Sequence, residues 1–163
     1  MEARDPTVLT MIAQYLVSSR REDGELAEKL LKFIPCMREN RSNDRFFQYN
    51  ECIRWINDNY PFLYYTGESY QQTGTPIPYA VSPEAKYLCK PISAENGSFT
   101  VPLNREEQEL LNKFNGLDFQ TRLMLADCSA KLNRNNPAAW HTWLRSPVPE
   151  QIRYAKIMGG NPA

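Results

Sequence analysis

Prolines and glycines divide this chain into two regions that can be helical and a middle region that cannot. Residues 61–103 contain six of the twelve prolines, together with three glycines. Proline lacks the backbone N–H that a helix needs, and glycine favours turns. Between them, the short apolar and aromatic runs at 62–65, 77–81, 87–89 and 99–101 predict strands or extended loops. The polar run 68–75 predicts a hairpin tip.

Three helical patterns precede this middle region. Leu9, Ile12 and Leu16 repeat at helical spacing and predict a first helix. Asp-Gly at 23–24 predicts a break in the chain, followed by a second helix that Pro35 ends or kinks. A third helix is expected from about residue 42, and its apolar stripe consists of Phe46, Tyr49, Ile53, Ile56 and Tyr60.

Helical patterns resume at Asn104, which has capping-box spacing to Glu107. Gly116 is a natural helix stop, and Asp118 can cap the next helix. The polar run 133–136 is expected to be a linker. Pro137 suits a first helical position, and two short helices are expected around 140–144 and 150–158.

These patterns predict an α+β fold that is mainly helical. Three N-terminal helices are followed by a short β-hairpin or extended segment rich in proline and aromatic residues, and then by a helical C-terminal part. At 163 residues, we expect a single compact domain over 1–163, with sub-parts at 5–85 and 104–158.

Charge and hydropathy argue against several function classes. The 19 basic and 19 acidic residues cancel, which gives no support to generic electrostatic binding of nucleic acid or anionic membranes. No apolar run approaches the 18 residues of a membrane span, and the first residues do not form a signal peptide. The sequence therefore predicts an intracellular, cytoplasmic protein that does not bind membranes.

The cysteines do not form a metal-binding pattern. Cys36, Cys52, Cys89 and Cys128 include no CxxC pair, and a single histidine cannot complete a Cys/His zinc site. Glycine-rich phosphate loops and other cofactor motifs are also missing from the sequence. We therefore expect reduced thiols, with no metal and no cofactor.

The order of elements over residues 7–85 resembles a winged helix-turn-helix domain. Residues 25–30 resemble its second helix, residues 52–64 its third helix running into the first wing strand, and residues 79–82 its returning strand. The resemblance implies that the third helix lies in a major groove and that the 68–75 segment forms the wing. The implied nucleic-acid contacts are Arg41, Arg45, Gln48 and Arg54.

Aromatic residues are concentrated in the middle of the chain, where 11 of the 19 lie between Phe46 and Tyr87. Because no basic residue lies between Tyr60 and Tyr79, a stacking platform for nucleic acid is less favoured than core packing and a protein interface. The candidate interface aromatics are Tyr64, Tyr65, Tyr70, Trp140 and Trp143.

One catalytic arrangement can be written from the C-terminal residues. His141 would activate Cys128 or Ser129 as a nucleophile, oriented by Asp127. No motif around Cys128 supports this arrangement, and a thiol packed in a helix beside Ala126 and Ala130 is the favoured interpretation.

The sequence therefore favours a non-enzymatic intracellular adaptor or regulator that binds a macromolecule. The expected partner is another protein or a second copy of the chain. The first alternative is a winged-helix DNA-binding protein, and the second is an enzyme that depends on Cys128 and His141.

Overall fold

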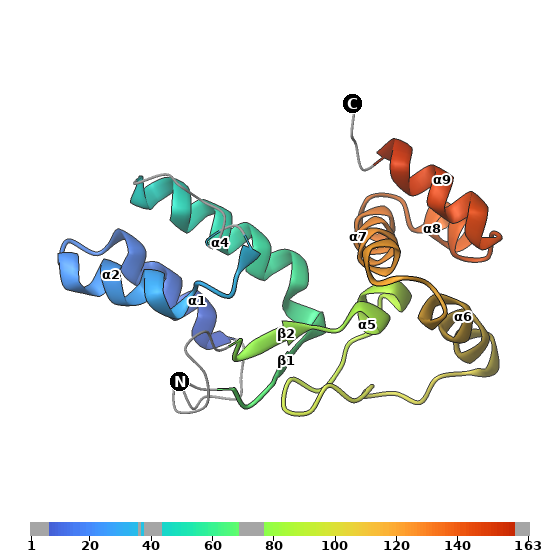
Figure 1. Ribbon diagram of the computed structural model, residues 1–163, viewed down its shortest axis with the longest axis horizontal. Helices are drawn as coiled ribbons and strands as arrows, with labels where there is room; N and C mark the ends of the chain where they lie inside the picture. Colours follow the sequence, from blue (N-terminus) through green and yellow to red (C-terminus); the bar gives the residue numbers. More distant parts are fainter. Residues whose placement is uncertain (1–6, 36, 38–43, 69–76, 159–163) are drawn as a thin grey trace. The chain divides into compact units, whose positions relative to one another are not determined.

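The computed structural model describes residues 7–35, 37, 44–68 and 77–158, and it is mainly helical with one small sheet (Figure 1). Strands β1 (Leu63–Tyr65) and β2 (Tyr79–Val81) pair in antiparallel orientation. The predicted α+β, mainly helical class is therefore confirmed. Most of the expected hairpin tip, residues 69–75, lies outside the described residues.

The chain forms two compact units. The first unit contains residues 1–80 and 94–97, and the second contains residues 81–93 and 98–163. The first sub-part was expected to end at residue 85, whereas in the structure the first unit ends at residue 80 and the second begins at residue 81. The difference arises because helix α5 (Pro83–Leu88) packs against α7 (Phe119–Asn135) of the second unit.

Helices form most of the first unit. It contains α1 (Thr7–Gln14), the 3₁₀ turn η1 (Tyr15–Val17), α2 (Arg21–Leu30), α4 (Arg45–Asn59) and the 3₁₀ turn η2 (Tyr60–Phe62). Helices α1 and α4 contact each other, and η1 contacts both α2 and α4. The buried apolar side chains of this unit come from all of these segments and include Leu9, Ala13, Leu16, Ala27, Leu31, Ile34, Cys52, Ile56 and Leu63.

The predicted break at 23–24 is wrong, because α2 runs through both residues. Gly24 is buried in the helix, where a Cβ atom would lie 3.4 Å from Arg45 Nε and 3.6 Å from the Leu16 carbonyl oxygen. Glycine at this position therefore serves close packing between segments and does not end the helix.

The apolar stripe predicted for α4 is confirmed at Ile56, which is buried, but it is wrong at its two ends. Phe46 is 69% exposed and Tyr60 is 41% exposed, whereas Gln48 is buried. The buried face consists of residues 48, 52, 56 and 59, which repeat at helical spacing. A glutamine can occupy this face because the Arg45 guanidinium donates a 2.8 Å hydrogen bond to its amide oxygen.

The strand or loop expected at 87–89 is wrong, because Tyr87 and Leu88 complete helix α5. The Ser82 hydroxyl accepts from the Ala85 N–H, and Pro83 occupies the first turn. Cys89 ends the helix in the left-handed region, at φ 54°. Of the run expected at 99–101, Phe99 forms an isolated antiparallel bridge with Ile92.

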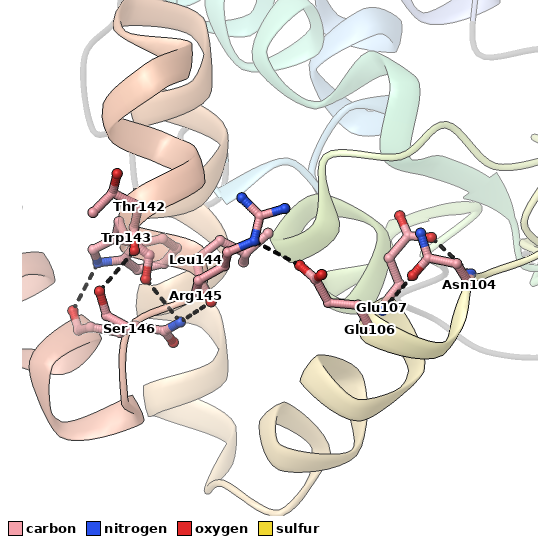
Figure 2. Close-up of polar contacts among 9 residues, drawn as sticks. Asn104, Glu106, Glu107, Thr142, Trp143, Leu144, Arg145 and Ser146 are labelled. Carbon is pink, nitrogen blue, oxygen red and sulfur yellow. Dashed lines mark hydrogen bonds and ion pairs between the residues drawn. The ribbon is translucent and has the colours of Figure 1, made fainter.

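The caps predicted for the C-terminal helices are confirmed. Asn104 and Glu107 form a reciprocal capping box at the start of α6 (Arg105–Asn115), which Figure 2 shows beside the 2.9 Å ion pair between Arg145 and Glu106. Gly116 caps the end of α6, and Asp118 caps α7. The linker predicted at 133–136 is wrong, since α7 continues to Asn135.

Two short helices close the second unit, as predicted: α8 (Pro137–Leu144) and α9 (Val148–Met158). Asn136 caps α8 by accepting from the Ala139 N–H. The core of the unit combines residues from α5 to α9, namely Tyr87, Leu88, Phe114, Leu125, Ala126, Leu132, Trp143, Leu144 and Ala155. Over the described ranges, none of the helices has the length and apolar character needed to cross a membrane.

Candidate functional site

Helices α7, α8 and α9 lie together in the second unit and contact one another (Figure 1). Their side chains line a groove of about 790 Å³. Helix α7 contributes one long wall, and α8 and the second half of α9 contribute the rest. Its lining residues are Gln120, Leu123, Met124, Asp127, Cys128, Lys131, Leu132, Asn135, Asn136, Ala139, Tyr154, Ala155 and Met158.

Helix α7 can form this wall because it is apolar on two faces. Its buried face consists of Leu125, Ala126, Ser129 and Leu132, of which Leu125, Ala126 and Leu132 belong to the core. Leu123 and Met124 turn toward the groove, and Leu123 is 37% exposed. The four consecutive apolar residues at 123–126 are a sequence signal for a second apolar face, which the sequence analysis did not use.

Apolar exposure continues at the ends of the groove. Met158 of α9 lines it and is 54% exposed. Next to Met158 in the chain, Ile157 is 72% exposed and lines an adjoining hollow of about 550 Å³. The hollow shares Leu132, Ala139 and Tyr154 with the groove, so the two depressions form one connected surface.

The charged residues that line the groove are Asp127 and Lys131, within the described part of the chain. Asp127 accepts a 2.5 Å hydrogen bond from the ammonium group of Lys86, which α5 presents. Lys131 is exposed and has no carboxylate partner among the residues that the structure describes. The groove thus combines apolar side chains with polar ones, and the Lys131 ammonium group is its charge without an opposite partner in the described ranges.

Buried hydrogen bonds hold the helices that form the groove. The Ser129 hydroxyl donates to the Tyr87 carbonyl oxygen at 2.5 Å and accepts from the Trp140 indole N–H at 2.7 Å. The Tyr87 hydroxyl donates to the Gln151 amide oxygen at 2.8 Å. Burial raises the pKa of Tyr87, which keeps this hydroxyl protonated at neutral pH.

Gln151 joins α9 to the end of α8. Its amide nitrogen donates to the carbonyl oxygens of Trp143 and Leu144, and the Trp143 indole N–H donates to the Gln151 carbonyl oxygen. These bonds satisfy carbonyl groups that a helix end leaves unpaired (Figure 2). The polar groups of the second unit therefore fix the walls of the groove.

The residues of the suggested catalytic arrangement differ in their surroundings: Ser129 is buried, Cys128 is partly buried and His141 is exposed. Ser129 is fully buried and its hydroxyl is used by Tyr87 and Trp140. The His141 ring lies against the Trp140 ring, with 4.8 Å between their centroids. Burial raises the pKa of the Cys128 thiol to about 11, so the thiol is protonated and weakly nucleophilic at neutral pH.

We expect Cys128 to react with iodoacetamide about 100-fold more slowly at pH 8 than a small unperturbed thiol, because the thiolate is the reactive form. Its rate should rise with pH until about 11. Peptide mass spectrometry across a pH series measures this rate, and circular dichroism checks that the fold persists. A rate that levels off near pH 9 would contradict this expectation.

The residues implied by the winged-helix resemblance do not form a common exposed face. Arg45 pairs with Glu28 of α2 at 2.8 Å and also binds Gln48, so both side chains join α4 to its own unit. The expectation that Gln48 faces outward is corrected by its burial. Arg54 is exposed and forms a 3.5 Å ion pair with Glu51. Arg41 lies outside the described residues.

The suggested interface aromatics also differ in their placement. Trp143 is buried, so the expectation that it forms an exposed contact is wrong, because it packs against Tyr87 within the core. Trp140, Tyr64 and Tyr65 are partly buried. Tyr70 lies outside the described residues.

No group of histidine, cysteine or carboxylate side chains that could hold a metal ion occurs within the described ranges. Cys52, Cys89 and Cys128 carry free thiols, and Cys36 is outside these ranges. The chain was also compared with known proteins, and no protein-family model, curated protein or solved structure matches it.

Proposed function

We propose that this chain is a non-enzymatic binding protein whose α7–α9 groove docks a segment of another protein. The observation that carries the proposal is the groove itself, whose lining combines apolar and polar side chains and which borders the exposed Leu123, Ile157 and Met158. Apolar grooves between helices commonly accept apolar side chains of a partner.

Leu123, Ile157 and Met158 are the exposed side chains from which we expect the binding energy to come. Burying one large apolar side chain completely contributes about 1.5–3 kcal/mol, and exposing it forgoes that stabilisation. Three such side chains around one connected depression give a partner a concentrated source of binding energy.

DNA binding through α4 has less support. Arg45 and Gln48 bind each other, and Arg45 also binds Glu28, so neither is offered to a base. The exposed residues at the start of α4 are Phe46 and Phe47, which do not attract phosphate. Arg54 remains as the described residue with which to test this alternative.

The decisive variant replaces Leu123 and Met158 together by glutamine, which keeps helix propensity and introduces no charge. We expect recovery of a protein partner from native cell extract to fall about tenfold or more, because two apolar contacts are lost. The partner is identified by mass spectrometry after capture by the tagged full chain, with and without nuclease.

The matched control replaces Met11 and Leu26, which are 61% and 57% exposed in the first unit, by glutamine. It should leave partner recovery unchanged. Equal loss in both double variants would refute the groove as the binding site. Recovery of nucleic acid alone, weakened by Arg54→Ala and released by salt, would favour the DNA-binding alternative instead.

A further inference from the structure

We infer that the groove binds an amphipathic helix that carries acidic side chains beside its apolar face. This inference rests on the proposed function and names the chemistry of the partner. It depends on the length of the groove and on the charges around it.

The length of the groove suits a helix. The residues that α7 contributes to the wall run from Gln120 to Asn135, along almost the whole of that helix. At 1.5 Å per residue, this wall is about 22 Å long, which corresponds to a partner helix of about 15 residues. Such a helix presents apolar side chains at i, i+4, i+7 and i+11. Along the α7 wall these would meet Leu123, Met124, Cys128 and Leu132, which alternate with polar residues.

The charges select an acidic partner. The Asp127 carboxylate pairs with the Lys86 ammonium group, which offsets its negative charge. Lys131 has no carboxylate partner in the described part of the chain. The α8 N-terminus also lies at the groove, through Asn136 and Ala139, and it adds partial positive charge. A carboxylate on the partner would therefore meet a positive end of the groove.

The same charges argue against a second copy of α9 as the occupant. Beside its exposed Ile157 and Met158, α9 carries Arg153 and Lys156. Glu150 is its one carboxylate, and it pairs with Arg153. A second α9 in the groove would bring a basic helix to Lys131, which is unfavourable.

The test uses two fluorescein-labelled peptides of about 15 residues and the full chain. Both peptides have leucines at i, i+4, i+7 and i+11. One has glutamates flanking the leucines, and its twin has lysines at the same positions. Fluorescence polarisation measures the dissociation constants at low salt, where charge contributes most.

We expect the glutamate peptide to bind about fivefold more tightly than its lysine twin. Lys131→Glu should remove or reverse this preference. The matched control is Lys113→Glu, which changes an exposed lysine in the last turn of α6, outside the groove. It should leave the preference unchanged, whereas Leu123→Gln with Met158→Gln should weaken both peptides.

If both peptides bind equally and depend on Leu123 and Met158, the acidic partner is refuted and the proposed function stands. If neither binds, the helical occupant is refuted, and the extract experiment decides the proposed function separately. A dimer by light scattering that the double variant abolishes would identify a second copy as the occupant and overturn the inference.

Discussion

Replacing Phe114 by alanine is expected to lower the free energy of unfolding of the second unit by about 3–5 kcal/mol. Phe114 is 1% exposed, and its ring stacks on the Tyr87 ring with 4.3 Å between the centroids. Alanine removes the ring and leaves a cavity between α5 and α6, which packed neighbours fill only in part. Because a domain of this size is stabilised by about 5–15 kcal/mol, most of the margin would be lost.

Urea unfolding followed by tryptophan fluorescence measures this change. A Trp55→Phe background restricts the signal to Trp140 and Trp143, which both belong to the second unit. The matched control is Phe119→Ala, since Phe119 is 55% exposed and begins α7. It should change the stability by about 0.5 kcal/mol or less. Similar losses in the two variants would show that Phe114 is not a core residue.

Replacing Gln151 by leucine is expected to cost about 3–5 kcal/mol. The shape of the side chain is nearly kept, but the Tyr87 hydroxyl loses its acceptor and the Leu144 carbonyl oxygen loses its side-chain donor. The Trp143 carbonyl oxygen loses one of its two donors and keeps the Ser146 N–H. Gln151 is 1% exposed, so water cannot replace these bonds without opening the structure. The same fluorescence measurement, in the same Trp55→Phe background, determines the cost.

A double-mutant cycle with Tyr87→Phe separates the hydrogen bond from the loss of packing. Once Gln151 is leucine, removing the Tyr87 hydroxyl should cost less than it does in the native protein, since the hydroxyl then has no acceptor. Gln108→Leu, on the exposed side of α6, is the control and should be nearly neutral. Additive effects of Gln151→Leu and Tyr87→Phe would contradict the coupling.

The hydrogen bonds of Tyr87 and Gln151 hold the walls of the groove as well as stabilising the unit. The Tyr87 carbonyl oxygen of α5 accepts from Ser129 of α7, and the Gln151 amide of α9 donates to the Leu144 carbonyl oxygen of α8. The Tyr87 hydroxyl also donates to Gln151. A variant that loosens any of these bonds should weaken partner binding through the fold. Binding variants are therefore placed at Leu123 and Met158, which are exposed and whose apolar side chains donate no hydrogen bond to the walls of the groove.

Several helix ends could be predicted from sequence because their stabilising contacts are local. Asn104 caps through Glu107, only three residues away, and Asp118 caps through Thr121 at the same spacing. Gly116 and Pro137 act at their own positions in the backbone. Contacts of this kind depend on adjacent residues and not on which helix packs opposite.

Helix α5 was not predicted from the sequence, although Ser82 caps it through the N–H of Ala85, only three residues away. Ser82 and Pro83 form a helix start, but Tyr87, Leu88 and Cys89 looked like a strand because they follow a proline-rich segment. The helix prevailed over the strand, and in it the Tyr87 ring is buried against the Phe114 ring. Tertiary packing often overrides the weak preferences of short runs.

The sequence by itself determined the mainly helical class and the caps of α6 and α7, because these depend on composition and on residues a few positions apart. Tertiary structure decided which faces are buried: Gln48 and Gln151 lie inside, while Leu123 and Met158 remain accessible at a groove. The physical reason is that a residue's burial depends on the helices that pack against it, and these come from distant parts of the chain.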